Sequence, residues 1–330
     1  MHFSPEVLRE QAQRLVDLQV KQDRSILGAY LRGSLLYGSP LIGGAGDVDL
    51  VFIHHHPPER EREIRPLTPT IHFDLAHHDQ TLYHQPRSLR TDPWMGPTLH
   101  DAQPLFDPQH FIDYTQSSVR GKFSDPETVA ARARPLLEQA RQFWLDRQLQ
   151  RPLGSLSELG PFLEAVEQAA TAVVLLAGPP LAVRRLGLDF AERTQSLDPG
   201  LDSDFLEVVG GHQCPPDKIQ SWIKPWADTL KKTEGEGHPL SQQSTYFEQA
   251  VRALLDSPRP RSALWPLLKT WTEGVSLLPA DHALRQTWRE ACGSLGLAGN
   301  AYQQRIDFFD RFLDRCQSAL DHWLGERGWS

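Results

Sequence analysis

Hydrophobic and polar positions follow two different periods along the chain. Up to about residue 115, short runs rich in β-branched and aromatic residues lie between turn-forming residues, which predicts a sheet with flanking helices. A Pro-Pro pair followed by alternating Glu and Arg, at 57–63, predicts a solvated loop or the start of a helix. The expected strands are 27–32, 48–53, 71–76 and 103–106.

Beyond about residue 123 the apolar residues recur at helical spacing to the C-terminus. Ser124-Asp125-Pro126-Glu127 is a capping box with proline at an early helical position, and it opens a helix that runs to about residue 150. We therefore expect an α+β protein, with a small mixed sheet flanked by helices over 1–122 and an all-α helical bundle over 123–330. Further helices are expected at 158–177, 181–196, 216–232, 244–255, 262–276, 280–295 and 299–326.

Composition narrows the class of protein. The 330 residues are 39% hydrophobic and 23% charged, and no stretch approaches the roughly 20 apolar residues of a membrane span. Residues 1–18 have the spacing of an amphipathic helix where a secretory signal would carry a basic region and an apolar run, so we expect a cytoplasmic protein. Cys214, Cys292 and Cys316 lie far apart, which predicts buried free thiols. The net charge of -8 and the absence of a basic half give no sign of an extended nucleic-acid surface.

The candidate chemistry begins with a Gly-Ser pair and two acids. A predicted strand ends at Gly33-Ser34, and a Gly-rich segment leads to Asp47-Val48-Asp49 at the start of the next strand. Side chains alternate across a strand, so Asp47 and Asp49 project from one face and can share a divalent cation, while Val48 and Leu50 point into the core. Gly33 and Ser34 lie at a strand-to-helix turn, where free backbone N–H groups favour a phosphate.

A third acid, Asp74, interrupts another apolar strand in Ile71-His72-Phe73-Asp74-Leu75. If this strand pairs beside the second, three carboxylates lie together, which is costly unless a metal neutralises them. Mg²⁺ is the expected ion because it takes hard oxygen ligands and is normally completed by substrate phosphates. A phosphate cradle beside a metal-binding acid cluster is suited to in-line attack on the α-phosphorus of a nucleotide.

At these residues the sequence resembles the nucleotidyltransferase superfamily of DNA polymerase beta and the aminoglycoside nucleotidyltransferases. The resemblance covers roughly residues 25–110 and includes Gly-Ser, a spacer, Asp-hydrophobic-Asp and a later hydrophobic-Asp-hydrophobic strand. It implies that Gly33 and Ser34 bind the triphosphate, that Asp47 and Asp49 ligate two Mg²⁺ ions, and that Asp74 ligates the catalytic one. One departure is Gly46, where many members have Ser.

The resemblance also implies an activity for each part of the chain. Residues 1–122 would form the catalytic domain and 123–330 the domain that binds the acceptor or another partner. The expected reaction transfers a nucleoside monophosphate, AMP from ATP, to a hydroxyl of a small-molecule acceptor and releases pyrophosphate. Many members with a helical bundle carry a general base there, for which Glu158, Glu164 and Glu167 are candidates.

Two other functions remain open on the sequence. An acidic chain favours a cationic small molecule as acceptor. A net negative charge is nevertheless compatible with a local basic patch, so a toxin-like or regulatory transferase that nucleotidylates a protein or a tRNA is the first alternative. A nucleotide-binding or interaction module without turnover is the second alternative.

Several other residues are candidates for roles in or beside this chemistry. His72 shares a strand face with Asp74 and is the best candidate for a histidine at the site. The run 54–56 of three histidines is assigned to a surface loop, and the basic pairs 184–185 and 231–232 to helix surfaces or phosphate contacts.

Overall fold

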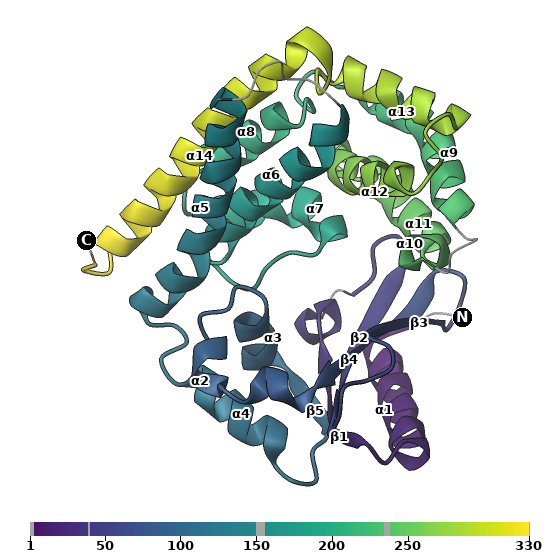
Figure 1. The fold of residues 1–330 in the computed structure, drawn as a ribbon, viewed down its shortest axis with the longest axis vertical. Helices are drawn as coiled ribbons and strands as arrows, with labels where there is room; N and C mark the ends of the chain where they lie inside the picture. The colour runs from purple at the N-terminus through teal and green to yellow at the C-terminus, as the bar shows by residue number, and fades with distance from the viewer. Residues whose placement is uncertain (1–2, 39, 150–155, 234–237, 330) are drawn as a thin grey trace. The chain divides into compact units, whose positions relative to one another are not determined.

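The structure is a computed structural model that describes residues 3–38, 40–149, 156–233 and 238–329. Its residue contacts divide the chain into two compact units, Met1–Thr128 and Val129–Ser330. The first unit contains the sheet and the second is helical, which confirms the predicted α+β layout with a C-terminal helical part (Figure 1). The sequence pattern placed the division after residue 122, and the contacts place it after Thr128.

The N-terminal unit is built on a five-stranded mixed sheet with the order β3-β4-β2-β1-β5. β2 and β4 run parallel, and every other neighbouring pair is antiparallel. All four predicted strands are present. The strands are β1 (Ile26–Arg32), β2 (Gly46–His54), β3 (Arg62–Pro66), β4 (Ile71–Asp79) and β5 (Gln103–Phe106).

Helices cover both faces of this sheet. Helix α1 (Pro5–Gln22) begins at Ser4, whose side chain accepts a hydrogen bond from the Val7 N–H, and its apolar face packs on one side of the sheet. Val48 and Leu50 of β2 are fully buried in this layer, as predicted. On the other side, Val51 and Ile53 pack with residues of α3 (Met95–Asp101) and α4 (Phe111–Arg120) (Figure 1). The short α2 (Pro86–Leu89) precedes them.

Strand β3 corrects the sequence prediction of a loop or helix start at 57–63. Residues Arg62–Pro66 pair antiparallel with β4 at the edge of the sheet. An edge strand is exposed and tolerates charged side chains, so it lacks the apolar alternation that identifies a buried strand. Ile64 is the one apolar residue within β3.

The second unit is an assembly of helices with an aromatic core. Trp226 donates a hydrogen bond to Thr270, and Trp271 donates one to Thr229, so both buried indole N–H groups are satisfied. Every helix predicted in this part of the chain is present. The helices are α5 (Pro126–Leu149), α6 (Leu159–Val174), α7 (Val183–Thr194), α8 (Gly200–Val208), α9 (Pro216–Lys232), α10 (Pro239–Gln242), α11 (Ser244–Leu255), α12 (Leu264–Ser276), α13 (Ala283–Ser294) and α14 (Tyr302–Gly325).

Two of the described helices in this unit, α8 and the short α10, were not predicted. The apolar residues of α8, Leu201, Phe205 and Val208, recur at helical spacing and are buried. The helix was missed because a segment of nine residues that begins beside Pro199-Gly200 resembles a loop in the sequence. The three cysteines are free and buried, as predicted. No helix among the described residues is long and apolar enough to cross a membrane.

Candidate active site

The parallel pairing of β2 and β4 brings the three predicted acids to one face of the sheet. Asp49 lies directly beside Asp74 in the strand register, and Asp47 lies beside His72. Directly paired residues of neighbouring strands project to the same side, so all four side chains share the face opposite α1. The condition set by the sequence, that the strand of Asp74 neighbours the strand of Asp47 and Asp49, is therefore met.

The backbone of Gly33 lies against the carboxylate of Asp49. Its φ of 80° is in the left-handed region, and a Cβ built on it would overlap the carboxylate of Asp49. Only glycine combines this backbone conformation with so close an approach. The Gly-Ser turn and the acid on the neighbouring strand are thus in direct contact.

Ser34 opens a single 3₁₀ turn, η1 (Ser34–Tyr37), where the Leu36 N–H donates to the Gly33 carbonyl at 3.1 Å. Its hydroxyl is shielded from solvent and has no hydrogen-bond partner within the described part of the chain. Buried hydroxyls are normally paired, so an unpaired one next to the acids indicates capacity for a contact that the protein alone does not supply.

A tight hairpin at Ile42–Ala45 directly precedes β2. Ile42 and Ala45 exchange backbone hydrogen bonds of 2.9 and 3.0 Å. Gly43 and Gly44 between them both have positive φ, as a two-residue hairpin turn requires. The spacer between the Gly-Ser pair and the acids is therefore structured in its second half.

Arg62 is a residue of the candidate site that the sequence interpretation missed. From the edge strand β3, its Nε donates to Oδ1 of Asp74 at 2.8 Å and its Nη2 to Oδ2 at 2.5 Å, a bidentate pair. The hydrogen bond to Asp74 raises the pKa of Arg62, with added contributions from the charges of Asp74, Asp49 and Asp47. Arg62 therefore lies in the field of all three acids.

The signal for Arg62 was present in the sequence but ambiguous. Alternating Glu and Arg after a Pro-Pro pair is typical of a solvated segment, and nothing in the pattern indicates that one of its arginines reaches a buried acid on another strand.

The acids are not assembled as a three-ligand metal centre. Among the described residues, no group of three or more His, Cys, Asp or Glu side chains is arranged to hold a metal ion. Both oxygens of Asp74 accept from Arg62, so this carboxylate is already charge-paired. Asp47 and Asp49 are partly exposed, and two carboxylates completed by phosphate oxygens fit Mg²⁺.

Buried polar groups continue along the same face of the sheet. His72 is 4% exposed and shares the face of Asp74, as predicted. Further along β4, Nδ1 of His78 lies 2.6 Å from the Tyr83 hydroxyl, which is 3.1 Å from the Tyr30 hydroxyl. Burial lowers the pKa of His78 to about 4, assisted by the charge of Arg32.

His54 corrects the assignment of residues 54–56 to a surface loop. It is the last residue of β2 and 5% exposed, and its ring contacts Ser25 Oγ and His77 Nδ1, each at 2.9 Å. Burial lowers the pKa of both His54 and His77. The pair lies at the opposite end of β2 from the acids.

The three candidate glutamates of the helical unit differ in their contacts. Glu158 pairs with Arg147 at 2.7 Å and Glu167 with Lys269 at 2.6 Å. Glu164 is exposed and has no ion-pair or hydrogen-bond partner among the described residues.

Three of the four residues in the two basic pairs of the helical unit are engaged in contacts within it, and Lys232 is exposed. The Arg184 guanidinium lies 3.8 Å from the centre of the Tyr246 ring, and Arg185 pairs with Asp189 at 3.1 Å. Lys231 pairs with Glu248 at 3.7 Å. These contacts account for Arg184, Arg185 and Lys231 without a phosphate ligand.

No protein-family model matches the chain, and no curated protein matches it significantly.

Proposed function

We propose that the N-terminal unit is a Mg²⁺-dependent nucleotidyltransferase that moves a nucleoside monophosphate, AMP from ATP, onto a hydroxyl and releases pyrophosphate. The observation that carries this proposal is the parallel register of β2 and β4, which sets Asp49 beside Asp74 on the face where Gly33 contacts Asp49. A phosphate-binding turn in contact with acids is the arrangement that nucleotidyl transfer needs.

Each residue has a distinct role in the proposed reaction. The backbone at Gly33 and the hydroxyl of Ser34 would hold the triphosphate, and Asp47 and Asp49 would hold Mg²⁺. When bound, the metal would supply charge stabilisation at the phosphates and lower the pKa of the attacking hydroxyl. Asp74, paired with Arg62, would be the third carboxylate beside the metal.

The proposed acceptor is a small molecule. A net charge of -8 disfavours an extended phosphate backbone as acceptor and favours a neutral or cationic compound. Modification of a protein or a tRNA is the alternative within the same chemistry.

The proposal is tested by pyrophosphate release from ATP and Mg²⁺ in the presence of extract from the source cells, with Asp49→Asn as the variant. Loss of a metal-holding carboxylate should reduce turnover by about a thousandfold or more while the unfolding midpoint changes little. Asp17→Asn is the matched control, because Asp17 is an exposed acid of α1 whose one side-chain hydrogen bond with a described residue is accepted from Gln13. Equal turnover in wild type and Asp49→Asn would contradict the proposal.

The label from ATP identifies the acceptor class. With α-phosphorus-labelled ATP, label in small polar products supports the small-molecule acceptor, whereas label in protein or RNA supports the alternative. Binding of ATP in calorimetry without any pyrophosphate release would instead favour a module that binds nucleotide without turnover.

A further inference from the structure

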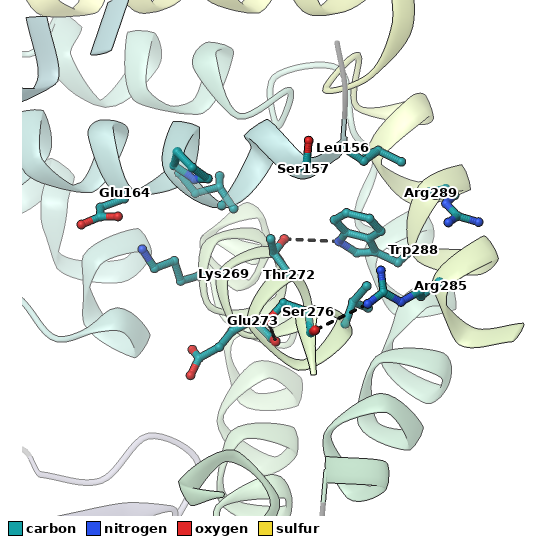
Figure 2. A pocket seen from close by; sticks show the side chains of 14 residues that line it. Leu156, Ser157, Glu164, Lys269, Thr272, Glu273, Ser276, Arg285, Trp288 and Arg289 are labelled. Atoms are coloured by element: carbon teal, nitrogen blue, oxygen red, sulfur yellow. Dashed lines mark hydrogen bonds between the residues drawn. The ribbon is translucent and has the colours of Figure 1, made fainter. Parts of the chain in front are cut away.

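The helical unit contains a cavity of about 740 Å³ that the proposed chemistry does not use. It lies among the start of α6, the second half of α12 and the helix α13, all within one unit (Figure 2). Its size is in the range of sites for small organic ligands.

One side of the cavity is basic. Arg285 and Arg289 follow each other by one turn of α13, so both line the same wall. Arg285 donates to the carbonyl of Leu278 at 2.6 and 3.2 Å, which fixes its guanidinium beside the end of α12. Arg289 is exposed and has no acid paired with it in the described part of the chain. This wall therefore carries two positive charges that no described carboxylate neutralises.

The other side is acidic. Glu164 of α6 and Glu273 of α12 line it, together with Lys269, whose charge is matched by Glu167 at 2.6 Å. The carboxylate of Glu273 lies 3.9 Å from Nε2 of His238. The charge of Lys269 is neutralised by Glu167. The carboxylates of Glu164 and Glu273 therefore give this side of the cavity a net negative charge.

An apolar wall separates the two charged sides. Figure 2 shows Trp288 between Arg289 and the Lys269–Glu164 side, with its indole N–H donating to Thr272 Oγ1 at 3.2 Å. That hydrogen bond fixes the plane of the ring. Leu163 and Val275 add apolar surface. Trp288 is 5% exposed, so the cavity offers a small apolar surface, including part of a fixed indole ring, between a positive and a negative end.

From this arrangement we infer that the cavity binds a zwitterionic small molecule, with an ammonium group toward Glu164 and Glu273 and a carboxylate or phosphate group toward Arg285 and Arg289. A ligand with one charge would leave the opposite pair of side chains partly desolvated without a partner, which weakens binding. A planar apolar body between the two charges would lie against Trp288. This inference concerns binding alone and does not depend on nucleotidyl transfer.

The test uses three probes of one shape: 4-(aminomethyl)benzoate, benzoate and benzylamine, each titrated into the full-length protein by calorimetry. The zwitterion should bind about tenfold more tightly than either singly charged probe. A fourth probe, 4-(aminomethyl)phenylphosphonate, separates the two anion classes: tighter binding than the benzoate assigns a phosphate ligand, and weaker binding a carboxylate.

Two variants locate the charges. Arg289→Gln should weaken the zwitterion and benzoate but leave benzylamine unchanged, and Glu164→Gln should weaken the zwitterion and benzylamine but leave benzoate unchanged. Both side chains are exposed, so the fold tolerates either change, and Glu290→Gln is the matched control on the same helix. The inference is overturned if none of the probes binds, if benzoate or benzylamine binds as tightly as the zwitterion, or if the two variants bind all probes as the wild type does.

Discussion

At the scale of single residues, the candidate site depends on close packing between a glycine and a carboxylate. Gly33 has a positive φ, and its missing side chain leaves the space that the Asp49 carboxylate fills. Ser34 beside it keeps an unpaired hydroxyl within the described part of the chain. The motif alone made both residues candidates, but the contact between Gly33 and Asp49 is visible only in the structure.

Removal of the Arg62 guanidinium should change both the stability of the protein and its response to Mg²⁺. In Arg62→Met the 4% exposed Asp74 loses both hydrogen bonds, so the free energy of unfolding should fall by about 1 to 3 kcal/mol. The three acids then lose the positive charge that Arg62 supplies, and Mg²⁺ alone should raise the unfolding midpoint of the variant more than that of the wild type. Thermal unfolding with and without Mg²⁺ measures both effects.

Arg60→Met is the control for that experiment, because Arg60 is exposed on the same segment and has no described contact with Asp74. An equal Mg²⁺ effect on Arg62→Met and wild type would contradict this expectation.

At the scale of elements, the sequence predicted four of the five strands and missed β3. β1, β2 and β4 have apolar runs that only a sheet interior explains, whereas β3 lies at an edge and is mostly charged. The positions of the three acids suggested that the strand of Asp74 lies beside the strand of Asp47 and Asp49. The hydrophobic pattern alone does not determine strand order, because that order depends on contacts between residues distant in sequence. Asp74 was therefore predictable as a candidate, and its partner Arg62 was not.

The buried histidines of β2 and β4 predict how acid affects this sheet. The pKa of His78 is lowered to about 4 in the fold by burial, so the unfolded chain, with its ordinary histidine value near 6.5, takes up the proton first. The stability that depends on neutral His78 is complete above about pH 6.5 and is lost as the pH falls toward 4. His54 and His77 add to the loss with the same sign.

Urea unfolding of the wild type should give a lower free energy of unfolding at pH 4.5 than at pH 7. Protonation linked to His78 should account for about 2 kcal/mol of this decrease, a figure reduced to allow for the partial exposure of the ring. His78→Asn keeps an acceptor for the Tyr83 hydroxyl and should lose correspondingly less stability on acidification. The exposed His84→Asn serves as control and should behave as the wild type. An unchanged pH dependence in His78→Asn would contradict the assignment.

At the scale of the whole molecule, the chain consists of two units with different kinds of core. The N-terminal unit buries the two faces of one sheet against helices, and the second unit buries aromatic side chains among helices. Helical periodicity was sufficient to place most of the second unit's helices. Its cavity was not predictable, because the charged residues that line it come from three helices and look like ordinary surface charge in the sequence.

The thiols report on the integrity of the second unit. Burial raises the pKa of Cys214, Cys292 and Cys316, so neither access nor ionisation favours reaction in the folded state. A thiol reagent such as dithionitrobenzoate at pH 8 should therefore titrate none of them rapidly in the native protein and all three in denaturant. A fast-reacting thiol in the native protein would show that a helix covering it opens readily.

The glycine hairpin at Ile42–Ala45 has a consequence for chain length. Because Ile42 and Ala45 are joined by reciprocal backbone hydrogen bonds, this hairpin fixes the length of chain directly before the acids of β2. An added or deleted residue there would be absorbed by breaking the hairpin or by sliding the acids out of step with their neighbour strand. Natural insertions in related chains should consequently spare this stretch or come as whole turns.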